Sequence, residues 1–151
     1  MNEFPIIRAN KKSISKRSKL CGVGINDADY IVRVVFDGKS ISCPYYSVWA
    51  SMIQRCYSKK YHKRKPTYIG CSVSEDWKIF SIFKHWMGKM IWNNKQLDKD
   101  ILSPGNKIYN PNNCIFISNE INTLLNNCKS SRGIYPIGSH ITNRLTNTWL
   151  P

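Results

Sequence analysis

Long apolar runs are missing from this sequence, and none approaches the roughly 20 residues that a helix needs to cross a bilayer. The basic residues near the N-terminus are followed by no apolar segment of the kind that a secretory signal contains. The sequence therefore predicts a protein that is neither secreted nor embedded in a membrane. At 151 residues with 42% hydrophobic residues, it is long enough for one folded domain.

Closely spaced cysteine pairs are also missing, although the chain has six cysteines. Without a secretion signal, these widely spaced residues predict free thiols in a reducing compartment rather than three disulfides. Cys56, His62 and Cys71 are the nearest approach to a zinc motif, but their spacing is irregular. We expect no structural zinc.

Acidic residues are scarce: 9 Asp and Glu stand against 23 Lys and Arg, which gives a formal net charge of +14. Such an excess favours a polyanionic partner, and nucleic acid is the first candidate. A solvated tail and loop, or a membrane surface, are the alternatives. The charge gathers in two clusters, from which we predict nucleic-acid contacts by Lys11, Lys12, Lys16 and Arg17, and by Arg55, Lys59, Lys60, Lys63, Arg64 and Lys65.

Three segments have clear local patterns. Residues 30–44 alternate around Asp37-Gly38, which predicts a β-hairpin. Apolar residues at spacings of three and four predict an amphipathic helix after Pro44 and a second one capped by Ser74. Residues 1–20 read as a flexible basic arm, and residues 58–70 as a basic loop.

The segment LDKDILSPGNKIYNPNNCIFISNEIN, residues 97–122, has a different composition. It predicts a strand over 96–102, a long turn over 103–112, a return strand, and a helix from about Asn119 to Asn127 capped by Ser118. The fold class is thus α+β: an N-terminal hairpin, two amphipathic helices and a strand–loop–strand–helix unit. The domain spans residues 21–128, and residues 129–151 form a short tail.

This segment resembles the signature of phage-encoded HNH-like proteins related to homing endonucleases, a His-Me finger family with a ββα-metal unit. GVGINDADY, CPYYSVWASMIQRCYS, PTYIGCSVSEDWKIFSIFKHW and RGIYPIG are similar to further segments of that family. The resemblance covers roughly residues 20–140. It implies a DNA-binding protein in the cytoplasm of an infected cell, with double-stranded DNA as its partner and Mg²⁺ or Mn²⁺ as cofactor. The tail is similar to the start of a small DNA-binding module.

Carried over by position, the resemblance makes Asp98 and Asn122 metal ligands and Asn113 the Asn of the loop. Lys99 falls where the family has its general-base His, and a lysine is protonated at neutral pH unless burial depresses its pKa. Asp100 is a nearby carboxylate, and His62 or His85 are the candidates to replace the base.

Three functions follow as hypotheses: a metal-dependent DNA endonuclease of the nicking or homing type, a DNA-binding protein on the same frame without cleavage, and a phage protein that inhibits a host protein. In the second, Lys99 would contact phosphate. The oligomeric state stays open.

Overall fold

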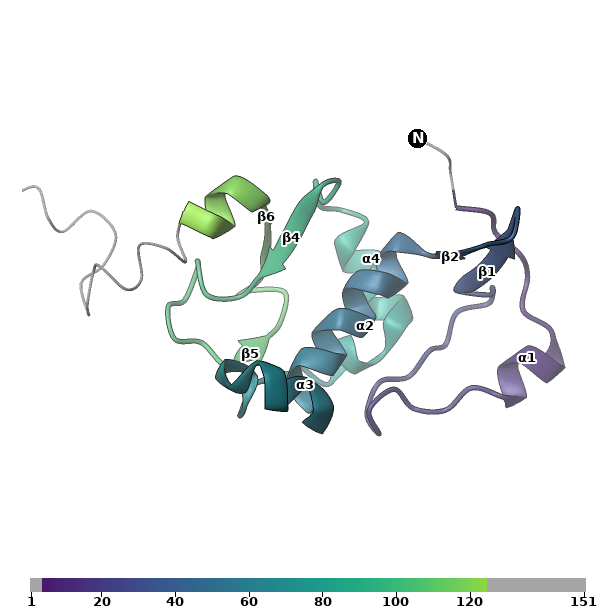
Figure 1. Ribbon diagram of the computed structural model, residues 1–151, viewed down its shortest axis with the longest axis horizontal. Helices are drawn as coiled ribbons and strands as arrows, with labels where there is room; N and C mark the ends of the chain where they lie inside the picture. Colours follow the sequence, from purple (N-terminus) through teal and green to yellow (C-terminus); the bar gives the residue numbers. More distant parts are fainter. Residues whose placement is uncertain (1–3, 125–151) are drawn as a thin grey trace, which may run out of the picture.

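The computed structural model describes residues 4–124 of the chain, and the fold is mixed α and β. Figure 1 shows an elongated arrangement with a hairpin and a short helix at one end and a strand pair followed by a helix at the other. The elements in chain order are α1 (Lys11–Ser15), β1 (Arg33–Phe36), β2 (Lys39–Ser42), α2 (Pro44–Tyr57), α3 (Lys59–Arg64), η1 (Pro66–Tyr68), β3 (Ser72–Val73), η2 (Asp76–Lys78), α4 (Phe80–Met87), β4 (Lys95–Asp98), β5 (Ile108–Tyr109) and β6 (Ile115–Ser118). Residues 119–124 are helical.

The core lies between α2 and α4, as the apolar spacing predicts. Helix α2 has Pro at its first turn, where a missing N–H costs nothing, and buries Trp49, Met52, Ile53 and Cys56. Helix α4 buries Phe80, Phe83 and Met87. Farther along the predicted apolar stripe, Trp86 is only partly buried and Met90 is exposed.

The start of α4 differs from the prediction that Ser74 caps it. The chain after Ser74 forms the short 3₁₀ turn η2, and α4 begins at Phe80. The carboxylate of Asp27 accepts hydrogen bonds from the backbone N–H of Ser81 at 2.9 Å and from its hydroxyl at 2.5 Å. The helix is therefore capped from a segment 54 residues earlier, which no local pattern reveals.

The N-terminal segment is docked rather than a flexible arm over residues 4–20. The guanidinium of Arg17 donates to the carbonyl oxygens of Asn26, Ala28 and Tyr30 at 2.6–3.0 Å. Backbone hydrogen bonds join Ala9 to Asp29 and Ile31 to Ile7. Arg17 thus holds this segment in place, and its guanidinium is engaged within the protein, while its phosphate contact stays a prediction.

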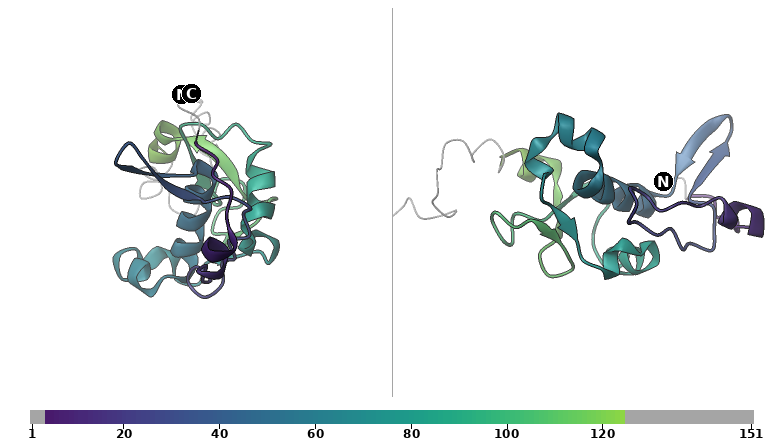
Figure 2. Two further views of the ribbon diagram at one scale, coloured as in Figure 1. Left: turned by 90° about the vertical axis from the view of Figure 1, so that its right-hand side faces the viewer. Right: turned by 90° about the horizontal axis from the view of Figure 1, so that it is seen from below.

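The hairpin β1–β2 forms as predicted, with Asp37 and Gly38 at φ of +50° and +68° in its two-residue turn. Figure 2 shows it projecting from the body. Its inner residue Val34 is buried, whereas Val35 and Phe36 near the tip are exposed.

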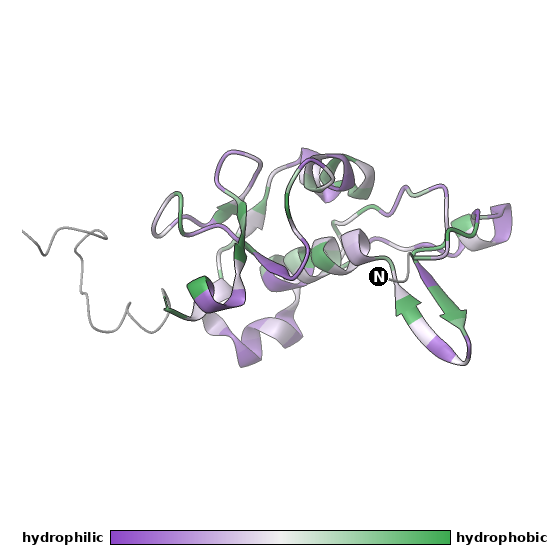
Figure 3. Ribbon diagram, turned by 90° about the horizontal axis from the view of Figure 1, so that it is seen from above, coloured by the Kyte–Doolittle hydropathy of each residue, from purple (hydrophilic) through white to green (hydrophobic). Residues whose placement is uncertain are grey.

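The predicted basic loop contains a helix. Ser58 caps α3 by accepting the N–H of Tyr61 through its hydroxyl, and the 3₁₀ turn η1 follows. Figure 3 shows the hydrophilic colour on α3.

Strands β4 and β6 pair antiparallel with Asp98 opposite Ile115, and residues 119–124 continue as a helix. The Ser118 hydroxyl accepts the N–H of Ile121, which agrees with its predicted cap role. The first strand ends at Asp98 instead of reaching residue 102. Between these strands, β5 pairs in parallel with β3, so the long turn is anchored midway.

The predicted tail, residues 129–151, lies outside the described residues, as does the end of the last helix. Among residues 4–124, no helix has the length and apolar character to span a membrane.

Replacing Asp27 with Ala removes the cap of α4. We expect the free energy of unfolding to fall by about 1 kcal/mol, the usual cost of losing an N-cap side chain. Asp29→Ala is the matched control, because the exposed Asp29 accepts the N–H of Ala9 through its backbone carbonyl, which the substitution keeps. Urea denaturation of both variants measures the difference, and equal stabilities would contradict the capping role.

Candidate functional site

A pocket of about 100 Å³ lies where β4 and its following loop meet α2 and the last described helix. Its walls bring together three of the residues that the resemblance singles out, namely Asp98, Lys99 and Asn122. The full lining is Arg55, Tyr68, Gln96, Leu97, Asp98, Lys99, Asp100, Tyr109 and Asn122. Two acids, two cations and two amides thus face one small space.

Asp98 is held by its own backbone surroundings. Its Oδ1 atom accepts the N–H of Asp100 at 2.8 Å and of Ile101 at 2.9 Å. A carboxylate bonded to the N–H groups two and three residues ahead makes a turn, which explains why β4 stops here. This contact fixes the orientation of the carboxylate at the pocket wall.

Asn122 lines the same pocket from the helix and is linked to β4. Its Nδ2 donates to Oε1 of Gln96, and Gln96 in turn donates to Oδ1 of Asn119 at 2.8 Å. Gln96 therefore ties the helix to β4 at two positions one turn apart. This link sets the position of Asn122 relative to the pocket.

Lys99 is buried, with 7% of its side chain exposed. Its ammonium donates to Oδ1 of Asp100 and to the carbonyl oxygen of Asn106, each at 2.6 Å. Asn106 also donates to the carbonyl oxygens of Lys99 and Ile108. Lys99 thus braces the start of the loop against its middle, and its two strong contacts lie within the protein.

Arg55 enters the pocket from the last turn of α2. Its guanidinium lies 5.8 Å from the centre of the Tyr68 ring, and Tyr109 lines the same pocket. Burial raises the pKa of Tyr109, so its hydroxyl stays protonated and uncharged. Among the described residues, no carboxylate lies within ion-pair distance of Arg55.

The remaining predicted site residues lie elsewhere. Asn113 is in the turn before β6, where its N–H donates to Asn110, and it does not line the pocket. His62 hydrogen-bonds the backbone carbonyl of Arg55 through Nε2 at 2.8 Å, and His85 is exposed on α4. Neither of these two histidines lines the pocket.

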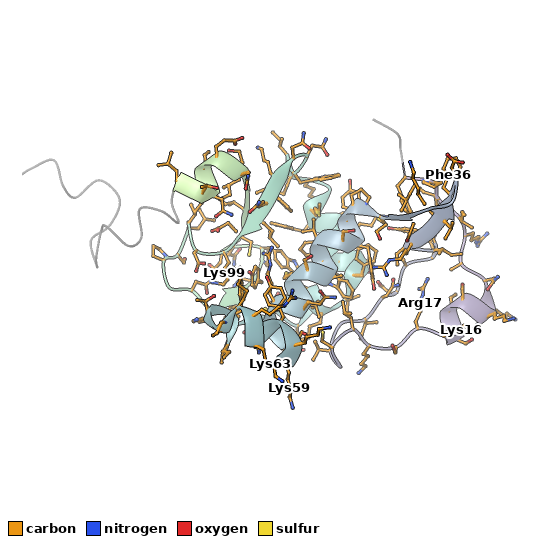
Figure 4. The ribbon with its side chains drawn as sticks, viewed as in Figure 1. Lys16, Arg17, Phe36, Lys59, Lys63 and Lys99 are labelled. Carbon is orange, nitrogen blue, oxygen red and sulfur yellow. The ribbon has the colours of Figure 1, made fainter. Side chains whose placement is uncertain are left out.

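The basic side chains of the second cluster are spread over α3 and the residue after it. Lys59, Lys60, Lys63, Arg64 and Lys65 are all exposed. Figure 4 shows Lys59 and Lys63 pointing away from the body. In the first cluster, Lys11, Lys12 and Lys16 are exposed on or next to α1.

Within residues 4–124, no three His, Cys, Asp or Glu side chains form a group that could hold a metal ion. The thiols of Cys43, Cys56, Cys71 and Cys114 are buried and free, and Cys21 is exposed. Burial raises the pKa of Cys56 and of Cys114 to about 12, so both stay protonated near neutrality.

The sequence did not predict that Gln96 and Tyr68 belong to the site. It predicted Arg55 as a nucleic-acid contact, but not its place in the pocket. One signal for Arg55 is its helical spacing, because Ser47, Ser51 and Arg55 recur every four residues along α2. Comparisons with protein-family models, curated proteins and solved structures gave no match for this chain.

Replacing Lys99 with Met leaves Asp100 and the Asn106 carbonyl without their common partner. We expect the free energy of unfolding to fall by about 1–3 kcal/mol, the cost of losing buried charge-assisted hydrogen bonds. Lys89→Met, at an exposed position, should change it by less than about 0.5 kcal/mol. Thermal and urea unfolding test this, and two equally stable variants would show that the Lys99 contacts contribute little.

The cysteines give a second prediction. In a Cys128→Ser variant, which removes the cysteine outside the described residues, a thiol reagent at pH 8 should modify the exposed Cys21 in the folded protein and the four buried thiols only on unfolding. Counting the released chromophore before and after denaturant measures this. Rapid modification of more than one thiol in the folded protein would contradict the burial.

Proposed function

We propose that this chain is a DNA-binding protein of the HNH type that hydrolyses phosphodiester bonds with the help of a divalent cation. One observation carries the proposal: Asp98 at the end of β4 and Asn122 on the following helix line a single pocket. Strand, loop, strand and helix are arranged in the order that a ββα-metal unit requires. Double-stranded DNA inside an infected cell is the substrate that we propose.

The charge distribution supports DNA as the partner. The five exposed cations at 59–65 lie on the segment that follows α2, and α2 delivers Arg55 to the pocket. Lysines and arginines that neutralise phosphates release counterions, so binding weakens steeply as salt rises. A backbone lying along α3 would therefore be held next to the pocket without any base being read.

The donor set fits a weakly held Mg²⁺ or Mn²⁺ ion. Asp98 offers a carboxylate fixed by two backbone N–H groups, and Asn122 offers an amide. Mg²⁺ is commonly bound through one or two carboxylates, with water and substrate phosphate completing the shell. Such an ion, when bound, would polarise the phosphoryl oxygens and stabilise the leaving oxygen.

The protein's own residues then have separate tasks. Asp98 and Asn122 would hold the ion beside the reacting phosphate, and Arg55, which has no ion-pair partner among the described residues, would attract that phosphate. Lys99 keeps the loop closed through Asp100 and Asn106. A water taken from solvent would attack phosphorus as the P–O bond to the leaving oxygen breaks, with bulk water accepting its proton and protonating the leaving oxygen.

DNA binding without cleavage is the second candidate, and Lys99 is the observation that favours it. The position of the general base carries an ammonium that is already paired with Asp100, and neither described histidine at 62 or 85 lines the pocket. In that case the pocket binds a backbone phosphate of the DNA without cleaving it, and the strand–loop–strand–helix unit is kept only as a scaffold.

Cleavage of supercoiled plasmid with Mg²⁺ or Mn²⁺ separates the two candidates. Asp98→Asn is the sharpest variant, since its amide oxygen can still accept the N–H bonds of Asp100 and Ile101 while the charge is lost. We expect metal-dependent nicking by the wild type and at least about a hundredfold loss in the variant. No cleavage by the wild type, together with salt-sensitive DNA binding, would leave the second candidate.

Binding itself is measured on a duplex as a function of salt. If about six phosphates are contacted, log K should fall with a slope of roughly −5 in log salt. Replacing Lys59, Lys60 and Lys63 with Gln should flatten the slope by about 3. An unchanged slope would remove α3 from the interface, and a flat wild-type dependence would argue for a protein partner instead of DNA.

A further inference from the structure

A second depression of about 220 Å³ runs between α2 and β4, next to the pocket of the candidate site. It is lined by Ser47, Val48, Ser51, Arg55, Lys95, Gln96 and Leu97. Arg55, Gln96 and Leu97 belong to both spaces. The two depressions are therefore adjacent and share these three lining residues, of which Arg55 is the only cation.

Helix and strand geometry explain how this groove arises. Ser47, Ser51 and Arg55 are spaced by four residues, so they lie along one side of α2. On β4, Lys95 and Leu97 point to one face while Gln96 and Asp98 point to the other. Lys95 lines only the groove and Asp98 only the first pocket, whereas Gln96 and Leu97 between them line both spaces.

The chemistry of the two spaces differs sharply. The first pocket holds Asp98 and Asp100 beside its cations, whereas the groove is lined by two cations and two hydroxyls and by no carboxylate. Among the described residues neither Arg55 nor Lys95 has an ion-pair partner. Arg55 is half-buried and its guanidinium lies over the Tyr68 ring, so that this contact orients it before any ligand arrives.

Two cations with two hydroxyl donors form a site for an anion with several oxygen acceptors. Charge-assisted hydrogen bonds from guanidinium and ammonium groups to phosphate are short and strong. Since the groove has no acid, no cation competes for the site. A phosphodiester is the ligand class that satisfies all four side chains.

We propose that this groove binds a second backbone phosphate of the DNA strand whose neighbouring phosphate lies in the candidate active site. The inference rests on the proposed DNA-binding function and adds a subsite that lies outside the strand–loop–strand–helix unit, on α2. Arg55 contacts both phosphates, whereas Ser51 and Lys95 contact only the second. The subsite therefore fixes the strand relative to Asp98 without taking part in the chemistry.

This division of roles makes the groove separable by mutation. Loss of one phosphate contact lowers affinity by about tenfold at 0.1 M salt and reduces the salt slope by about 1. Because serine and lysine read no base edge here, the loss should be the same for every duplex sequence. A substrate with a single phosphate cannot reach both sites and should be indifferent to the groove.

The test uses the full chain and a Ser51→Ala, Lys95→Gln double variant, with Lys95→Arg as the conservative variant and the exposed Lys89→Gln as matched control. Duplex affinity is measured by fluorescence anisotropy at several salt concentrations, on two unrelated sequences. Hydrolysis of bis(p-nitrophenyl) phosphate is measured in parallel. Thermal melting confirms that each variant is folded.

We expect about tenfold weaker duplex binding and a slope reduced by about 1 in the double variant, with Lys95→Arg and Lys89→Gln close to the wild type. If the wild type hydrolyses the small diester, the double variant should do so at the same rate. A folded double variant with wild-type affinity and slope would overturn the subsite while leaving DNA binding intact. A wild type that binds no duplex at low salt would overturn the proposed function and the subsite together.

Discussion

The buried indole N–H of Trp49 donates a 2.8 Å hydrogen bond to the carbonyl of Trp77, and the placement of the candidate site depends on the cluster built around it. Trp77 packs against Trp86 with ring centroids 4.4 Å apart, and Trp86 packs against Phe116 of β6 at 5.7 Å. This line of aromatic rings connects α2 through α4 to the strand pair that carries Asp98. Since α2 supplies Arg55 and β4 supplies Asp98, the aromatic contacts help to set the relative positions of a cation and an acid that line one pocket.

Patterns carried by a few neighbouring residues predicted local structure well. The Asp37-Gly38 turn, the Pro44 start of α2 and the Ser118 cap each depend on residues within one turn, and all three are present. Features joining distant segments were not predictable in the same way. Helix α4 takes its cap from Asp27, and Arg17 binds three carbonyls over residues 26–30, so propensity alone misplaced the helix start and left the arm unfolded. The capped helix α3 was hidden because five of its six residues are Lys, Arg or His and leave no apolar periodicity.

The candidate site divides along the same line. A position-by-position resemblance was enough to bring Asp98, Lys99 and Asn122 to attention, and they line one pocket. The contacts of these residues could not be predicted from the sequence. Lys99 pairs with Asp100 because the chain turns after β4, and the fold brings Arg55 and Tyr109 to the same pocket. The basic cluster at 55–65, taken as one group from its charge, consists of two kinds of cation: an oriented half-buried arginine and a row of solvated side chains.

The short parallel pairing of β5 with β3 has a consequence for the entropy of the chain. Residues 99–114 connect β4 to β6, and pinning residues 108–109 against 72–73 replaces one long closure by two shorter ones. The entropy lost in ordering residues 99–114 is then partly offset by contacts with a segment more than 30 residues earlier, since Ser72 pairs with Ile108. A peptide containing only the strand–loop–strand–helix unit would lack that anchor and the α2 face bearing Arg55. The unit is contiguous in sequence, but its shape is a property of the whole domain.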